Sequence, residues 1–137
     1  MALECVLVTE LELPVAFTCA DGTGIEKGAL LKLTDPMTVV TTAGDTDPII
    51  GIAAEEKVAN DGKTTIAVYL RGIFKGFAGA AGVTAGAGII SDTGTGAANE
   101  LVNADINSAN LVGRALETAT DTESFMFLLD SYAGKWA

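Results

Sequence analysis

The stretch TIAVYLRGIFKG, residues Thr65–Gly76, decides the fold, because β-branched, aromatic and aliphatic side chains dominate it without a helical period. Shorter runs of the same kind recur along the chain between clusters of Gly, Asp, Asn and Pro, which is the pattern of strands and turns. With Thr65–Gly76, the expected strands are Glu4–Glu10, Pro14–Cys19, Ala29–Leu33, Thr38–Thr42, Ile49–Ala54, Gly88–Ser91, Glu100–Asn103, Leu111–Glu117 and Ser124–Leu129. Only Asn103–Ala109 is compatible with a short helix, and a turn fits it equally well. The sequence therefore predicts an all-β fold with little helix.

The pattern of strands and glycines occurs twice along the chain. Each copy has a strand that follows a glycine turn, a strand with a glycine inside it, and a closing strand. Gly51 and Gly113 are 62 residues apart, and Ile66 and Phe125 of the closing strands are 59 residues apart. These offsets indicate an internal repeat, although short β units also resemble one another by composition alone. A glycine inside a strand predicts a bulge or a close approach of two backbones at Gly51 and Gly113.

The repeat suggests how the chain is organised. We expect an N-terminal arm or strands in residues 1–24 and a duplicated β domain in residues 25–137, with units at about 25–76 and 83–131. Two repeats are too few for a solenoid. Closing two curved halves removes exposed sheet edges, so we predict a small barrel-like domain built from two pseudo-repeated β units.

The composition excludes several classes of function. The 137 residues carry a formal net charge of −10, which argues against nucleic acid and anionic membranes as partners, since both attract basic surfaces. The chain has no histidine, which excludes any Ser-His or Cys-His mechanism. The two cysteines, Cys5 and Cys19, match no metal motif, and we expect free buried thiols rather than the disulfide that paired strands would also allow.

One motif resembles that of a protease. Asp92-Thr93-Gly94 has the signature of aspartic proteases, and Leu111–Arg114 resembles a later motif of the small retroviral type. Only 18 residues separate Gly94 from Gly113, which leaves no room for the flap hairpin and strands that such a protease needs. A hairpin turn is therefore the better interpretation.

The remaining polar residues form no catalytic or binding motif. Acidic residues at turns are Asp21, Asp45, Asp47 and Asp61. They lack the spacing of a calcium loop, and we interpret them as solvated turn residues. Lys27, Lys57 and Lys63 show no sign of the desolvation that a Schiff-base lysine requires. We therefore expect no catalytic residue, cofactor or metal ion, and a protein that is not an enzyme.

Binding through shape remains, and two regions carry candidate docking residues. Glu4–Glu10 has apolar side chains on both faces, which suits either strand addition to another chain or an ordinary strand of its own barrel. Aromatic side chains near residue 75 and near the C-terminus can anchor either a core or an interface. The docking or interface candidates are Leu3, Val6, Val8, Phe74, Phe77 and Trp136.

Six elements rich in Gly and aliphatic residues follow one another along the chain. They are Lys27–Leu31, Ile50–Ala53, Val68–Phe74, Ala85–Ile89, Leu111–Glu117 and Phe125–Leu129. In this order they resemble the capsid cement, or head decoration, proteins of tailed bacteriophages. The resemblance covers roughly residues 25 to 130, whereas residues 1–24 match no element.

The resemblance implies a structural virion protein that is made in the host cytoplasm and binds the exterior of an icosahedral capsid. It implies a homotrimer whose partner is the major capsid protein and whose contacts stabilise the shell. The alternatives are a fibre, tail or adhesin β domain and, from a different class, the small aspartic protease.

Overall fold

The computed structural model describes residues 4–42, 48–91, 99–103 and 111–130. Within these ranges the chain forms eleven strands and no helix, which confirms the expected all-β fold. Of the segment for which a short helix or a turn was expected, Asn103 ends a strand and residues 104–109 lie outside the described ranges.

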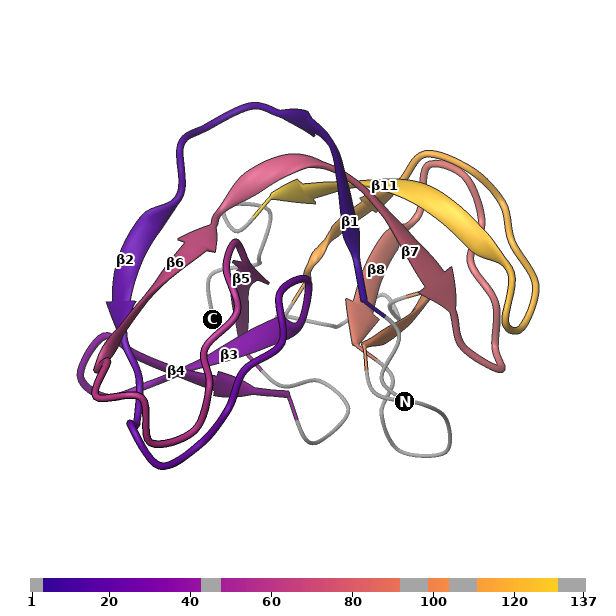
Figure 1. Ribbon diagram of the computed structural model, residues 1–137. Coiled ribbons are helices and arrows are strands. Elements are labelled where there is room, and N and C mark those ends of the chain that lie inside the picture. The colour runs from indigo at the N-terminus through magenta and orange to yellow at the C-terminus, as the bar shows by residue number, and fades with distance from the viewer. Residues whose placement is uncertain (1–3, 43–47, 92–98, 104–110, 131–137) are drawn as a thin grey trace.

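The first barrel consists of five strands in the left half of Figure 1. They are β2 (Val15–Thr18), β3 (Leu30–Thr34), β4 (Thr38–Thr41), β5 (Ile49–Ala53) and β6 (Thr65–Tyr69). Their order β2-β4-β3-β5-β6 closes because β6 pairs with β2. The β2–β4 pairing is parallel and the others are antiparallel.

The second barrel has the same strand order in the right half of Figure 1. Its strands are β7 (Arg71–Ala78), β8 (Gly88–Ser91), β9 (Glu100–Asn103), β10 (Gly113–Ala115) and β11 (Ser124–Asp130). The order β7-β9-β8-β10-β11 closes through the β11–β7 pairing, and β7–β9 is again the parallel pair. The remaining strand, β1 (Val6–Glu10), pairs with β7. Two pseudo-repeated β units are therefore confirmed.

The topology draws the units at different boundaries from those expected from sequence. The run Thr65–Gly76 is two strands that meet at Leu70, so that β6 closes the first barrel and β7 opens the second. The units of the topology are β2–β6 and β7–β11, whereas units at about 25–76 and 83–131 were expected. Strand β2, which lies within the residues 1–24 expected to form an arm or strands, belongs to the first barrel. No turn residue interrupts the run at Leu70, so the sequence shows no boundary there.

Equivalent side chains make the same contacts in the two barrels. In the first, the Ala67 N–H donates to Glu55 Oε2 at 3.1 Å, and in the second the Met126 N–H donates to Glu117 Oε1 at 2.9 Å. Each carboxylate satisfies a backbone donor of the closing strand of its own barrel. The duplication therefore extends from strand order to individual hydrogen bonds.

Two hydrophobic clusters fill the molecule, and β3 supplies both. Leu31 points into the first barrel, whereas Leu30, on the opposite face, joins the cluster that fills the second barrel. Burial of one such side chain contributes about 1.5–3 kcal/mol to stability. The Leu30 N–H also donates to Oδ1 of the buried Asn99 at 3.0 Å. The outer face of one barrel is thus part of the core of the other.

The two glycines inside strands occupy equivalent close approaches. A Cβ added to Gly51 would overlap the carbonyl oxygen of Tyr69, and a Cβ added to Gly113 would overlap that of Leu128. Both acceptor carbonyls lie on closing strands. The expected close approach of backbones is confirmed at both positions.

We expect Gly51→Ala and Gly113→Ala each to lower the free energy of unfolding by about 1–3 kcal/mol, because the added Cβ forces two backbones apart. Urea unfolding followed by circular dichroism measures the loss. Gly22→Ala is the matched control, since a Cβ there meets nothing nearer than Asn60 Oδ1 at 3.9 Å. Unchanged unfolding midpoints for both test variants would contradict this interpretation.

Candidate docking surface

Exposed apolar side chains gather on one segment of the chain. Of the nine large apolar side chains that are exposed among the described residues, five lie between residues 6 and 15, on β1, on the connection that follows it and at the start of β2. They are Val6, Val8, Leu11, Leu13 and Val15, and together they form the apolar strip. Contiguous exposed apolar surface of this kind marks an interaction site more often than isolated exposed residues do.

Backbone pairing and core contacts anchor the strand that begins the apolar strip. Strand β1 pairs antiparallel with β7, and its Leu7 packs against the larger hydrophobic cluster. Cys5, just before the strand, is buried, and its N–H donates to the Gly28 carbonyl at 2.9 Å. Val6 points to the opposite face from Leu7, as alternation along a strand requires, and is exposed. Val8 lies where the β1–β7 register shifts between Leu7 and Thr9, and its side chain is exposed as well. The first part of the strip, Val6 and Val8, therefore lies on a strand that runs beside β7 in Figure 1.

The charged residues next to the apolar strip in the sequence are all acidic. Glu4, Glu10 and Glu12 are the only charged residues from position 4 to position 15. Burial raises the pKa of Tyr69, and the charge of Glu10 and its side-chain hydrogen bond to Tyr69 raise it further. Glu10 thus lies at the end of β1, beside the joint between the barrels at Leu70.

A small cavity of about 220 Å³ opens at the start of the strip. Its lining residues are Glu4, Cys5, Val6, Leu7, Lys27 and Tyr69. Burial raises the pKa of the Cys5 thiol to about 12, so the thiol stays protonated and unreactive at neutral pH. The cavity has the volume for a side chain or a few waters rather than for a larger ligand.

The structure places the docking residues expected from sequence in different environments. Val6 and Val8 are 60% and 50% exposed and belong to the apolar strip. Phe74, in contrast, is 1% exposed and stacks on Phe127 in the core, so it is not available to a partner, which corrects the expectation for this residue. Leu3 and Trp136 lie outside the described residues.

Phe77 lies near the end of β7 and is half-buried. It pairs with Ser124 of β11 on one side and with Glu100 of β9 on the other, where the second barrel closes. Its backbone therefore pairs with both neighbouring strands of the barrel, while its ring remains partly accessible.

The two thiols are free, as expected. Cys5 belongs to the cluster that fills the second barrel, whereas Cys19 belongs to the cluster of the first barrel. The two side chains are thus parts of separate cores.

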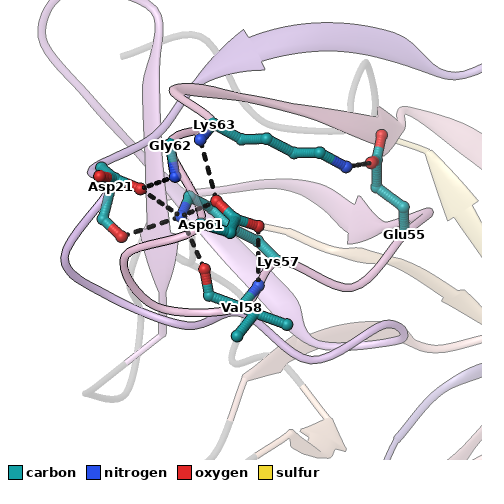
Figure 2. A network of polar contacts seen from close by, with 7 residues as sticks. All are labelled: Asp21, Glu55, Lys57, Val58, Asp61, Gly62 and Lys63. Carbon is teal, nitrogen blue, oxygen red and sulfur yellow. Dashed lines mark hydrogen bonds and ion pairs between the residues drawn. The ribbon is translucent and has the colours of Figure 1, made fainter.

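A buried lysine holds two loops together at one end of the first barrel, as Figure 2 shows. The Lys57 side chain is 1% exposed. Its Nζ donates to the Asp21 carbonyl at 2.9 Å, to Asp61 Oδ1 at 3.1 Å and to the Val58 carbonyl at 3.1 Å, and it lies 3.4 Å from Asp21 Oδ1. These contacts satisfy the ammonium group that burial has removed from water.

This Lys57 network corrects two expectations from the sequence. Lys57 is desolvated, but burial, which alone would lower its pKa, is outweighed by the hydrogen bonds and charges of Asp61 and Asp21, and the net shift is upward. A lysine that is held protonated is not a nucleophile. Asp21 and Asp61 are not simply solvated turn residues either, because both contact this ammonium group.

No group of three or more His, Cys, Asp or Glu side chains in the described part of the chain could hold a metal ion. Asp45, Asp47 and the Asp92-Thr93-Gly94 motif lie outside that part. In the same ranges, no helix could span a membrane.

Sequence reasoning missed Leu11, Leu13, Val15 and Lys57. For Leu11 and Leu13 a signal exists, since acidic and apolar residues alternate from Glu10 to Leu13. For Lys57 only the structure reveals the burial: the bridge Ile25–Lys57 corresponds to the bridge Val83–Ala119, where a buried alanine occupies the equivalent place.

No family model matches the chain, and no curated protein matches it. Among solved structures, the chain is similar to the crystal structure of the N base of the head fiber gp8.5 in bacteriophage phi29. The TM-score is 0.57 at 16% sequence identity, over 90% of this chain and 98% of that one. At this identity the similarity shows a shared fold.

We expect the stability that Lys57 provides to depend on pH at both extremes. The Lys63 N–H, and after it contacts with Lys57 and Val58, hold the pKa of Asp61 below its ordinary 3.8. The stability that the ionised Asp61 contributes is therefore complete above pH 3.8 and is lost as the pH falls through the folded pKa. The raised pKa of Lys57 makes its contribution complete below 10.5, and it is lost as the pH rises through the folded pKa.

The difference in urea midpoint between wild type and Lys57→Met measures this dependence, and it should be constant from about pH 5 to pH 10 and shrink outside that window. Lys63→Met is the control, because Lys63 is exposed and its Nζ lies 3.9 Å from Glu55. A difference that does not change with pH would contradict the ionic role of Lys57.

We expect deletion of residues 1–10 to prevent cooperative folding, because it removes β1 and with it Leu7 and Cys5 from the core. Circular dichroism and urea unfolding of the shortened chain test this result. Deletion of residues 1–3 alone serves as the control. A chain without residues 1–10 that keeps wild-type stability would show that β1 is dispensable to the fold.

Proposed function

We propose that this chain is a structural virion protein of a tailed bacteriophage and that it attaches to the outside of the head. The observation that carries the proposal is the fold similarity to the phi29 head fiber base, which extends over 98% of that base. The ordered resemblance to head decoration proteins supports the same class. The role is structural rather than catalytic and requires no cofactor.

In the form we favour, the protein is a decoration protein. Three copies form a trimer on the capsid exterior, and the major capsid protein is the partner. Exposed apolar surface on the strip, five side chains on one segment, provides the kind of contact that such docking needs. A ligand that binds only the mature shell stabilises that shell by mass action. A net charge of −10 keeps the free chain soluble in the host cytoplasm before assembly and disfavours nucleic acid and membranes as partners.

The second candidate is the base of a head fibre, and the comparison itself favours it. The similar structure is the base of such a fibre, and it aligns with 90% of this chain. A fibre base and a decoration protein share the attachment to the head and differ in what the attachment does. A decoration protein stabilises the shell, whereas a fibre base only needs to be held by it.

Binding to capsids tests the shared claim. Purified protein is mixed with mature capsids that lack it, and bound protein is separated from free protein by sedimentation. We expect saturable binding in multiples of three and a trimer by light scattering. A rise in the capsid melting temperature on binding supports the decoration role, and binding without such a rise supports the fibre base. Failure to bind the capsids of its own phage would contradict both.

The triple variant Val6→Ser, Val8→Ser, Leu13→Ser tests the strip. We expect it to fold as the wild type does and to bind capsids at least about tenfold more weakly, because contiguous apolar contacts dominate interfaces. The matched control is Met37→Ser with Val58→Ser, which makes the same chemical change at exposed positions outside the strip. A triple variant that binds capsids no more weakly than the control variant, whether both lose binding or neither does, would contradict a docking role for the strip.

A further inference from the structure

We propose that Asp61-Gly62 is a latent site of spontaneous isoaspartate formation and that the Lys57 network keeps it unreactive in the folded protein. This proposal concerns the chemistry of the loop in Figure 2 and does not depend on the proposed function. Asp-Gly pairs are the natural place for it, because a glycine on the C-terminal side leaves the attacking amide unhindered. The sequence contains two such pairs, Asp21-Gly22 and Asp61-Gly62.

The modification joins two neighbouring groups and then opens again. The Gly62 amide nitrogen loses its proton and attacks Cγ of Asp61, so that an N–Cγ bond forms and the carboxyl oxygen leaves as water. One water then adds to the main-chain carbonyl carbon of Asp61 in the resulting succinimide and breaks its bond to Gly62 nitrogen. The chain then runs through the Asp61 side chain, with no net change in composition and with one extra backbone atom. No oxidant or other reactant is required.

The nucleophile of this step is restrained. The Gly62 N–H donates to Asp21 Oδ1 at 2.8 Å, and the Gly62 backbone has a φ of +86°. Attack requires this nitrogen to lose its proton and to turn toward the carboxyl group of Asp61. A charge-assisted hydrogen bond to a different carboxylate opposes both changes.

The electrophile is restrained as well. Asp61 Oδ1 accepts from Lys57 Nζ at 3.1 Å and from the Lys63 N–H at 2.9 Å, and Oδ2 accepts from the Val58 N–H at 3.3 Å. These donors fix the side-chain rotamer and stabilise the ionised carboxylate. The ionised form is the poorer electrophile, because its oxygen leaves only after protonation. The lowered pKa of Asp61 acts in the same direction.

The second barrel shows that the turn does not need the lysine. Its equivalent loop makes the same cap, in which the Thr120 N–H donates to Glu123 Oε2 at 2.8 Å as the Val58 N–H does to Asp61 Oδ2. Alanine, at position 119, takes the place of Lys57, and serine follows Glu123. A glutamate followed by serine does not close a five-membered succinimide. The buried lysine therefore accompanies the loop that carries the reactive pair.

The experiment measures isoaspartate at position 61 during long incubation of the full chain at neutral pH. Trypsin releases residues 58–63 from the wild type, a peptide that contains Asp61 but not Asp21. Chromatography with electron-transfer fragmentation then separates and identifies the two isomers. We expect isoaspartate to accumulate about tenfold or more slowly in the folded chain than in the same chain unfolded in urea, because reaction requires the loop to open. Equal rates in both states would overturn the proposal.

Two variants assign the protection to the network. Lys57→Met should accelerate isoaspartate formation several-fold while near-ultraviolet circular dichroism shows the native fold, and Asp21→Ser should do the same by removing the acceptor of the Gly62 N–H. Lys63→Met is the matched control, since it removes a positive charge from the same loop but keeps the backbone N–H that contacts Asp61. If Lys57→Met does not fold, Asp21→Ser and the urea comparison carry the test. Folded Lys57→Met and Asp21→Ser that react no faster than Lys63→Met would overturn the role of the network.

Discussion

Strands β3 and β5 are apolar on both faces, and the rest of the structure depends on covering the outer one. Leu31 and Ala53 fill the first barrel, whereas their neighbours Leu30 and Ile52 are fully buried against the second. A unit of about 60 residues buries only a modest share of its surface and is marginally stable by itself. Packing one barrel on the outer face of the other enlarges the shared core. The duplication is thus the reason that this small β protein can hold together, as well as its most visible regularity.

The same packing determines where the chain can face a partner. The β6–β7 joint at Leu70 runs directly from one barrel to the other, and β1 lies along β7 beside that joint. Residues 11–14 then connect β1 to β2, and in Figure 1 this connection arches over the outside of the two barrels. The exposed side chains of the apolar strip lie on this connection and on the strand residues beside it. Within the described chain, no other segment of this length exposes as many large apolar side chains. Docking through this surface would therefore use a part of the molecule that the core already fixes in position.

Much of the fold could be predicted from the sequence, because strands and turns each have a local residue pattern that can be recognised without the structure. The repeat was visible as well, since Gly51 and Gly113 mark equivalent close approaches that only glycine allows. The unit boundary was hidden, because Tyr69, Leu70 and Arg71 continue an unbroken strand pattern and only pairing partners reveal the change of barrel. The environments of individual side chains were harder to predict than the strands. Whether Phe74 faces a core or a partner and whether Lys57 is buried depend on long-range packing, which no local pattern encodes.

The central claim is that these two tandem barrels sit on the outside of a phage head. A cryo-electron microscopy reconstruction of the virion that is proposed to carry the chain tests it most directly. The account predicts density on the outer capsid surface into which both barrels fit, with the apolar strip turned toward the shell or toward a neighbouring copy. Density for the barrels in the tail or inside the capsid, or a head surface that lacks them, would contradict it.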